Sequence, residues 1–245
     1  MTLPPWLATE GGARGIARLI DYTFLRPEAT AAEIDRLCDE GRAAGVIAVC
    51  VNGGWVVRCV GRLRGSGIRV AAVVGFPLGA GSAPAKAAEA AFAVRDGATE
   101  LDMVMPIGLA KAGDWDAVSE DVAAVVAAAG DVPIKVILET AVLTPGEITA
   151  ACRASQRAGA AFVKTSTGFH SAGGATVEAI RVLRAAVGSH FGVKASGGIR
   201  TAEAALAMLS AGANRIGASS LSGFGGIIGD QAPALADLLS VRAPA

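Results

Sequence analysis

Six charged residues interrupt short apolar runs of this chain, each next to at least one aliphatic residue. They are Asp21, Asp102, Lys135, Glu139, Lys164 and Lys194. An isolated charge in a buried run would be costly, but three acids and three lysines can compensate one another. The set is either a structural network of ion pairs or a catalytic site, and the grouping of six such residues favours a site.

The two lysines Lys164 and Lys194 indicate which chemistry that site would perform. A lysine attacks a carbonyl only as a neutral amine, and burial together with a second cation nearby lowers its pKa. The pair therefore predicts an amine that forms a Schiff base with a carbonyl substrate. Asp102 is the leading candidate for the carboxylate that moves protons, and Lys135 and Glu139 are expected to support the electrostatics around Lys164.

Small residues follow the two apolar runs nearest the C-terminus. Lys194 precedes the sequence ASGGIR, and the run NRIGA precedes two serines. Small side chains let backbone N–H groups approach a phosphate, and a helix beginning after Thr201 would add partial positive charge. The two loops together predict a phosphate site, and the segment 165–169 could close the same pocket.

These residues need a scaffold, and the chain alternates β-branched runs with alanine-rich helical stretches. Eight runs are expected to be strands: 19–25, 46–51, 69–75, 99–105, 133–139, 161–166, 191–196 and 214–218. Capping boxes at Thr30–Glu33 and Thr144–Glu147 mark helix starts, and further caps are expected at Asp114, Thr176 and Thr201. Strands that alternate with helices predict a parallel sheet with right-handed crossovers.

The length of 245 residues suits one closed α/β barrel. We expect residues 1–245 to form a single domain, a (β/α)8 TIM barrel with a short N-terminal helical lead-in over residues 1–18. An open doubly wound sheet is the alternative, but eight evenly spaced units favour closure. Period-two alternation would then point the charged residues into the barrel, near the end where such barrels place their chemistry.

Composition excludes several classes of protein. Hydrophobic residues make up 52% and charged residues 18%, which excludes a disordered chain. The 22 basic residues balance the 22 acidic ones, so no nucleic-acid partner is expected. The apolar stretch 70–85 is broken by glycine and proline, and the N-terminus lacks a basic region followed by an apolar one. We therefore expect no membrane span and no secretion signal.

The four cysteines form no CxxC pair and have no neighbouring histidines, so no metal site is expected. They suit the reducing cytoplasm, which is the expected location. Cys50 would end the second strand facing inward. It could line the pocket, although a buried structural thiol is the simpler interpretation.

Several motifs together carry a resemblance to a known family. They are IDYTFLRPEAT, VCVN, VVGFPLGA, ELDMVM, KVILET, FVKTSTGF, VKASGGIR and GASS, spread over residues 19–222 without a large insertion. In these motifs the chain resembles the deoxyribose-phosphate aldolases, class I aldolases built on a (β/α)8 barrel. The order of VKTSTGF and VKASGGIR after ELDMV is highly specific.

The resemblance implies reversible cleavage of 2-deoxy-D-ribose 5-phosphate into D-glyceraldehyde 3-phosphate and acetaldehyde. It assigns the Schiff base to Lys164, the perturbation of its pKa to Lys194, and proton transfer to Asp102. Phosphate contacts would come from Gly168, Gly197, Ile199, Arg200, Gly217, Ser219 and Ser220. Supporting positions would be Asp21, Thr23, Cys50, Lys135, Glu139 and Thr165. No cofactor is expected because the protonated imine is the electron sink, and a homodimer or homotetramer is expected.

The chain departs from the family pattern at several places, and His170 and Ser171 occupy a variable part of the loop after the sixth expected strand. Tyr22 stands where histidine is common, VNGGW replaces the usual VNP segment, and the chain ends in LLSVRAPA where some members end in tyrosine. Two other functions stay open at this point. One is a Schiff-base aldolase or lyase for a different phosphorylated sugar, and the other is a phosphosugar-binding barrel without turnover.

Overall fold

Eight parallel strands close into a barrel in the computed structural model, which describes residues 7, 15–229 and 231–240. They are β1 Ile20–Phe24, β2 Ala48–Val51, β3 Arg69–Val74, β4 Glu100–Val104, β5 Ile134–Ile137, β6 Phe162–Lys164, β7 Gly192–Ser196 and β8 Arg215–Ala218. Each strand pairs with the next along the chain, and β1 also pairs with β8. The expected closed barrel is confirmed, with strand ends within about two residues of those expected.

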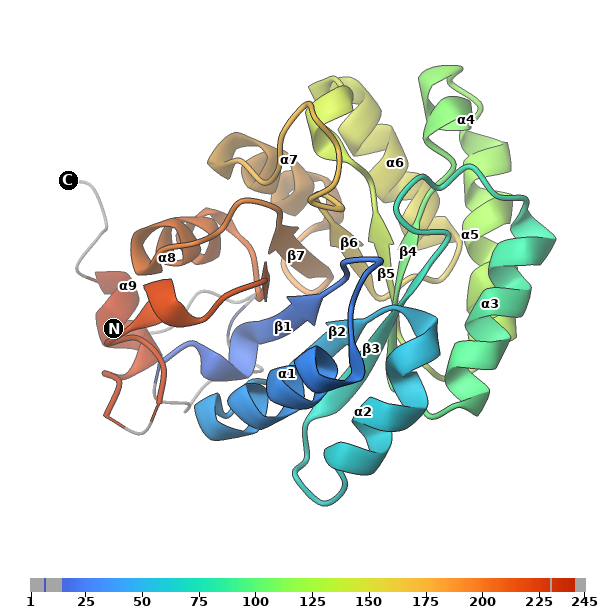
Figure 1. Cartoon of the computed structure of the whole chain (residues 1–245). Helices are drawn as coiled ribbons and strands as arrows, with labels where there is room; N and C mark the ends of the chain where they lie inside the picture. Colours follow the sequence, from blue (N-terminus) through green and yellow to red (C-terminus); the bar gives the residue numbers. More distant parts are fainter. Residues whose placement is uncertain (1–6, 8–14, 230, 241–245) are drawn as a thin grey trace.

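Helices surround the strands as an outer layer (Figure 1). They are α1 Ala31–Ala44, α2 Val56–Arg62, α3 Ala83–Arg95, α4 Ile107–Lys111, α5 Trp115–Ala129, α6 Pro145–Arg157, α7 Val177–Val187, α8 Ala202–Ala211 and α9 Leu235–Ser240. Short 3-10 turns lie at Ala17–Leu19, Gly53–Trp55, Thr140–Val142 and Ser222–Phe224. Most of the expected N-terminal lead-in lies outside the described residues.

The expected helix starts are confirmed. Both capping boxes form, so that in α6 Thr144 N donates to Glu147 Oε2 at 2.6 Å while Glu147 N donates to Thr144 Oγ1 at 3.3 Å. The side chains of Asp114, Thr176 and Thr201 also accept from the first turns of α5, α7 and α8. These caps fix where each helix leaves its preceding loop, at the barrel end that carries the site.

Replacing Thr144 with alanine is expected to lower the free energy of unfolding by about 1 kcal/mol, because the cap of α6 loses its acceptor. Urea denaturation measures the change. Thr149→Ala is the matched control, since its hydroxyl donates to Pro145 O inside the same helix and alanine is the better helix former. Equal destabilisation by both variants would contradict the capping role.

Strand register carries the charged residues to the inner face. The aliphatic neighbours Val136, Val163 and Val193 are fully buried in the apolar core that includes residues of the surrounding helices. The residues between them face the opposite side, because side chains alternate along a strand. Asp102 is the partner of Lys135 across β4 and β5, and Lys164 is the partner of Lys194 across β6 and β7. Four charged side chains therefore come from neighbouring positions on one surface.

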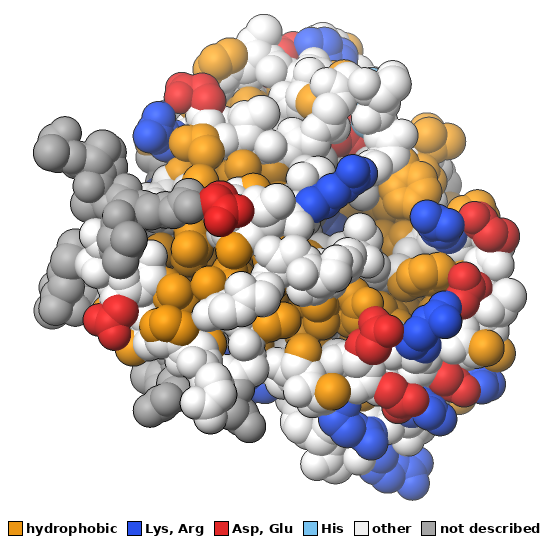
Figure 2. Space-filling model, turned by 60° about the vertical axis from the view of Figure 1, so that its left-hand side comes forward, with side chains coloured by type: hydrophobic (Ala, Val, Ile, Leu, Met, Phe, Trp, Pro, Cys, Tyr) orange, Lys and Arg blue, Asp and Glu red, His pale blue; other side chains and the backbone are white. Residues whose placement is uncertain are grey.

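Acidic and basic side chains are interspersed on the molecular surface in Figure 2, with no broad area of one sign on the part of that face that is described. This distribution agrees with the absence of net charge in the sequence. Among the described helices, none combines the length and the apolar character that crossing a membrane requires.

Candidate active site

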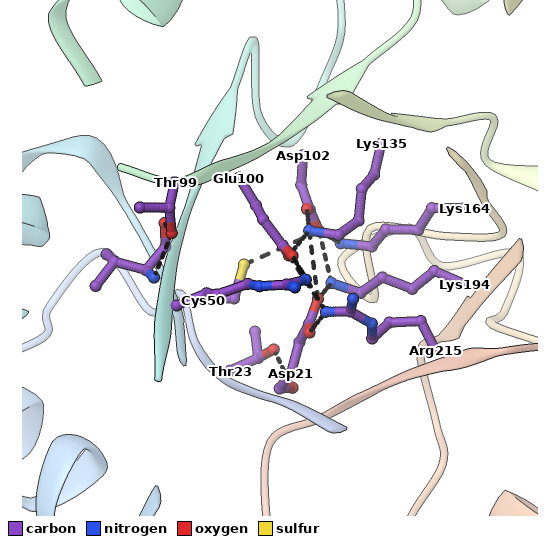
Figure 3. Close-up of polar contacts among 12 residues, drawn as sticks. Asp21, Thr23, Cys50, Thr99, Glu100, Asp102, Lys135, Lys164, Lys194 and Arg215 are labelled. Carbon is purple, nitrogen blue, oxygen red and sulfur yellow. Dashed lines mark hydrogen bonds and ion pairs between the residues drawn. The ribbon is translucent and has the colours of Figure 1, made fainter. Parts of the chain in front are cut away.

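Asp102 is the centre of the charge cluster inside the barrel (Figure 3). Its Oδ2 atom accepts from Lys164 Nζ and from Lys194 Nζ, each at 2.7 Å. Its Oδ1 atom accepts from Lys135 Nζ at 2.8 Å. Because one carboxylate oxygen binds both lysines, the two amines are held next to each other. The juxtaposition expected from the sequence is therefore present.

Asp21 is a second carboxylate shared by several cations. It forms ion pairs with Lys194, with Arg215 Nη1 at 2.8 Å and with Lys135 Nζ at 3.5 Å. Its side chain is fully buried. The cations hold the pKa of Asp21 well below its usual range, although burial alone would raise it. Asp21 thus stays ionised and keeps Lys194 in place beside Asp102.

Two further members of this cluster, Glu100 and Arg215, are not among the site residues predicted from the sequence. Glu100 Oε2 forms ion pairs with Lys135 Nζ at 2.6 Å and with Arg215 Nη1 at 3.3 Å. Both residues are buried. The alternation rule that selected Asp102 could have found them, because Glu100 lies two positions before Asp102 and Arg215 two positions before Gly217.

The two lysines have opposite electrostatic surroundings. Burial lowers the pKa of Lys164, and the Lys194 ammonium lowers it further, against the opposing effect of Asp102. Burial also acts on Lys194, but the carboxylates of Asp102 and Asp21 outweigh it and raise the pKa of Lys194. Lys164 is therefore the lysine that gives up its proton, while Lys194 remains a cation.

A cavity of about 320 Å³ opens beside Lys164 at the C-terminal ends of the strands. Lys164 lines it, whereas Lys194 and Asp102 lie behind it and are not among its lining residues. A substrate in this cavity would thus meet the amine of Lys164 first. Of the cluster's charged side chains within the described chain, Lys164 is the one exposed to the cavity.

Most of the expected phosphate residues line the same cavity. Its lining includes Gly168, Gly197, Ile199, Arg200, Gly217 and Ser219. Ser220 is not among the lining residues, and its hydroxyl instead lies 2.9 Å from that of Ser222. Helix α8 begins just after this loop, with its N-terminal N–H groups on the cavity side of the barrel.

Glycine is required at position 197. The residue has a φ of 92°, a conformation that side-chain-bearing residues rarely adopt, and an added Cβ would lie 3.0 Å from the Gly174 backbone. Gly217 is required for another reason, because a Cβ there would lie 2.8 Å from Ser196 Cβ and 3.3 Å from Lys194 Cε. The two glycines keep the loop close to the cavity and leave room for the second lysine.

Three of the supporting residues lie beside the cluster. Thr23 lines the cavity and donates to Asp21 O at 2.9 Å. Thr165 Oγ1 joins β6 to β7, donating to Ser196 O and accepting from Ser196 N at 3.0 Å each. Cys50 Sγ lies 4.0 Å from Asp102 Oδ2, and burial followed by the Asp102 carboxylate raises the pKa of its thiol to about 11. The thiol is therefore protonated at neutral pH.

Glu139 lies apart from the interior charges, contrary to the expectation that it would join them. It follows β5 with a positive φ of 56°, which turns its side chain toward the loop after β6. There its carboxylate accepts from Thr167 Oγ1 at 2.5 Å and from Thr167 N at 3.3 Å. Alternation along a strand does not extend past the strand's end, so Glu139 holds the loop after Lys164 instead of contacting the lysines.

A family model described as DeoC/LacD family aldolase matches residues 16–232. The chain belongs to this family. A deoxyribose-phosphate aldolase of Brevibacillus brevis is 54% identical over 203 residues, which cover 83% of this chain and 91% of that protein. A relative of that name from Mycobacterium avium is 51% identical over 208 residues, covering 83% and 92%.

Solved structures agree with this membership. A putative deoxyribose-phosphate aldolase from Coccidioides immitis matches with a TM-score of 0.81 and 45% identity, over 83% of this chain and 81% of that one. A deoxyribose phosphate aldolase from Aeropyrum pernix matches with a TM-score of 0.78 and 33% identity, over 85% and 88%. The chain is accordingly an aldolase on a TIM barrel.

Two departures of this aldolase from its family pattern, at Tyr22 and in the VNGGW segment, make no contact with the charge cluster that the structure records. Tyr22 points from β1 toward α1, where its hydroxyl donates to Glu40 at 2.5 Å. The VNGGW segment forms the 3-10 turn Gly53–Trp55, and Asn52 donates to Leu25 O at 3.2 Å. The last five residues, where some members carry a tyrosine, lie outside the described part of the chain. Within the described chain, no group of three or more His, Cys, Asp or Glu side chains could hold a metal ion.

Proposed function

We propose that this aldolase reversibly cleaves 2-deoxy-D-ribose 5-phosphate into D-glyceraldehyde 3-phosphate and acetaldehyde through a Schiff base on Lys164. The observation that carries the proposal is the position of Lys164. Its amine lines the cavity, its pKa is lowered, and it shares one oxygen of Asp102 with Lys194. A cavity lined by a nucleophilic amine and by glycine-rich loops suits a phosphorylated aldehyde.

The reaction begins when the neutral Lys164 amine attacks the aldehyde carbon C1 of the open-chain sugar. Loss of water gives a protonated imine. The bond between C2 and C3 then breaks, its electron pair moves toward the imine to form an enamine, and the C3 hydroxyl loses its proton to become the aldehyde of D-glyceraldehyde 3-phosphate. Protonation of the enamine at C2 and hydrolysis of the imine release acetaldehyde and regenerate the amine.

Asp102 would move the protons that these steps require, and Lys194 would keep the Lys164 amine ready to react. Asp102 stays ionised because its three lysine partners hold its pKa well below the usual range, although burial alone would raise it. It can accept a proton when the imine forms and return it when the enamine is protonated. Lys194 remains a cation throughout and keeps the Lys164 pKa low in the resting protein.

The loops after β7 and β8 would hold the phosphate, with Gly168 of the loop after β6 closing the pocket. Their glycines let backbone N–H groups approach an anion, and Arg200 on the cavity lining brings a positive charge. The proposed contacts are the residues of these loops that line the cavity, namely Gly168, Gly197, Ile199, Arg200, Gly217 and Ser219. Thr23, Thr165 and Glu139 would fix the strand ends and loops on which the substrate lies.

Gly197→Ala is expected to raise the KM for deoxyribose 5-phosphate roughly 10-fold or more, because the added Cβ forces the phosphate loop away from Gly174. The turnover of unphosphorylated deoxyribose should change far less. Gly188→Ala is the matched control, since Gly188 also has a positive φ, of 77°, but has open space around it. Steady-state kinetics with both sugars measures the difference, and equal losses for the two sugars would contradict a phosphate role.

Reductive trapping tests the Schiff base directly. The protein is mixed with deoxyribose 5-phosphate and borohydride, digested, and the modified peptide is located by mass. The expected adduct is on Lys164. An adduct on Lys194 would reverse the roles of the two lysines. If another phosphorylated sugar in a substrate panel forms the adduct faster, the substrate assignment fails. If the folded protein binds deoxyribose 5-phosphate without forming an adduct, it is a phosphosugar-binding barrel without turnover.

We infer that the protein acts as a homo-oligomer in the cytoplasm, on small phosphosugar and aldehyde substrates. The related Aeropyrum pernix deoxyribose phosphate aldolase is described as having a unique tetrameric structure, which supports assembly. The four cysteines are free thiols and are buried, in keeping with a reducing compartment. Light scattering coupled to size-exclusion chromatography tests the assembly, and elution as a monomer at working concentration would contradict it.

A further inference from the structure

A second layer of charge lies inside the barrel beneath the proposed catalytic lysines. We define the upper layer as Asp102, Lys164 and Lys194, and the lower layer as Glu100, Lys135 and Arg215. Glu100 binds Lys135 at 2.6 Å and Arg215 at 3.3 Å, and Arg69 at the N-terminal end of β3 binds Glu100 at 2.7 Å. Figure 3 shows the two layers meeting through shared contacts.

The layers are joined through two residues that touch both. Lys135 binds Glu100 below and Asp102 Oδ1 above, at 2.8 Å. Asp21 binds Arg215 at 2.8 Å and also pairs with Lys194. Lys135 therefore directly contacts the carboxylate that Lys164 uses, whereas Glu100 reaches it through Lys135 and Arg215 through Asp21 and Lys194.

Without the half-exposed Arg69, the buried cluster holds one more cation than carboxylates. Its cations are Lys135, Lys164, Lys194 and Arg215, and its carboxylates are Asp21, Glu100 and Asp102, all of them buried. The charges balance when one amine is neutral. Since Lys164 lines the cavity and has a single carboxylate partner, Asp102, it is the amine that can lose its proton at least cost.

We propose that Glu100 and Arg215 are positioning residues of the aldolase reaction. They set how strongly the Asp102 carboxylate stabilises the Lys164 ammonium. Glu100 does so through Lys135, and Arg215 does so through Asp21 and Lys194. The inference rests on the proposed function of Lys164. Neither residue lines the cavity, so each acts through its neighbours and does not touch the substrate.

The two residues act on Lys164 in opposite directions. Without the Glu100 charge, the ion pair between Lys135 and Asp102 becomes stronger. Asp102 then stabilises the Lys164 ammonium less. Without the Arg215 charge, Asp21 binds Lys194 more strongly, and the ion pair between Lys194 and Asp102 weakens. Asp102 then stabilises the Lys164 ammonium more. Glu100→Gln should thus lower the pKa of Lys164, and Arg215→Gln should raise it.

These directions follow after every charged or titratable group around Lys164 is included. The groups in the barrel interior are Asp21 from β1, Cys50 from β2, Glu100 and Asp102 from β4, Lys135 from β5, Lys194 from β7 and Arg215 from β8. Arg26, after β1, and Arg200, after β7, line the cavity with Lys164, and neither is changed in the variants tested. β3 contributes the apolar Val73 opposite Asp102. Cys50 is protonated at neutral pH and carries no charge there.

The test is the pH dependence of kcat/KM for deoxyribose 5-phosphate. The acid limb is expected to move down by about 1 pH unit in Glu100→Gln and up by about 1 pH unit in Arg215→Gln. The double variant, which removes one charge of each sign, should return near the wild-type profile. Arg58→Gln, which breaks the surface ion pair with Asp35, is the charge-matched control and should leave the profile unmoved.

A purely structural role would lower activity without these opposite shifts. Two shifts in the same direction, or none, would overturn the proposal. Arg69→Gln covers the case in which a buried variant does not fold, because the Arg69 side chain is 48% exposed. Without Arg69, Glu100 binds Lys135 more strongly, and Asp102 stabilises the Lys164 ammonium more. The acid limb should therefore move up slightly, and this shift should be smaller at high salt. Where the buried variants do not fold, an unmoved limb in Arg69→Gln overturns the proposal.

A second readout separates this proposal from the function on which it rests. Competitive acetylation with trace acetic anhydride over a pH series reports the titration of Lys164 without any substrate. If wild-type protein forms no adduct with deoxyribose 5-phosphate, the proposed function fails, whatever the acetylation shows. If wild-type protein forms the adduct but the acetylation profiles of the variants do not separate, the positioning role of Glu100 and Arg215 fails.

Discussion

Lys164→Leu is expected to lower the turnover of deoxyribose 5-phosphate by about 10⁴-fold or more, because no other amine lines the described cavity. Leucine cannot form the imine, so the bond between C2 and C3 has no electron sink. Binding of the phosphosugar should persist, since the glycine loops are untouched. Steady-state assays and calorimetric titration with deoxyribose 5-phosphate measure the two properties separately.

The same variant separates a catalytic site from a structural network of ion pairs. Removing one partner of a purely structural buried pair typically costs about 3–5 kcal/mol. If Lys164 is instead the surplus cation of the cluster, leucine removes a costly buried amine, and the free energy of unfolding should stay constant or rise. A large loss of stability together with retained turnover would support the structural network.

Lys111→Leu is the control for this experiment. The Lys111 ammonium lies on the outer surface, where it donates to Glu147 at 2.8 Å and to Val142 O at 3.2 Å. Its replacement removes the same charge from the protein without approaching the cavity. Turnover should therefore stay at the wild-type level, and a matching loss in both lysine variants would indicate a nonspecific effect.

The barrel and most of its site are readable from the sequence because they depend on local, periodic signals. Glycines after helices, capping boxes and β-branched runs each report a single element, and eight repetitions of them specify closure. The lysine pair follows from the same alternation, since Lys164 and Lys194 occupy matching places in neighbouring strands. The phosphate loops follow from their small residues.

Alternation could have marked Glu100 and Arg215 as facing inward, but which side chains they contact depends on strands that are far apart in the sequence and adjacent in the barrel. Arg215 joins Asp21, 194 positions away in the chain, and nothing local marks either residue as a partner of the other. Glu139 shows the opposite failure, because the alternation that correctly placed Lys135 ceases where the backbone turns to a positive φ. Sharing of one Asp102 oxygen by two lysines is likewise a property of the closed barrel alone.

Lys194→Met is expected to have the second largest effect. In the wild-type protein the Lys194 ammonium lowers the pKa of Lys164 and takes a share of Asp102 Oδ2. Methionine removes that cation while filling a similar volume. Asp102 then pairs with Lys164 alone through this oxygen, so the pKa of Lys164 rises and less neutral amine is present at neutral pH.

The sign of the pH dependence follows from this shift. Below the pKa of Lys164 the neutral fraction falls tenfold for each pH unit, so kcat/KM at neutral pH should drop roughly 10- to 100-fold. The deficit should shrink as pH rises toward the new pKa, because the amine is recovered there. The pH profile of kcat/KM measures this recovery. A loss that stays constant at every pH would instead mean that Lys194 transfers a proton itself, since its removal would then slow a chemical step that neutral Lys164 cannot restore.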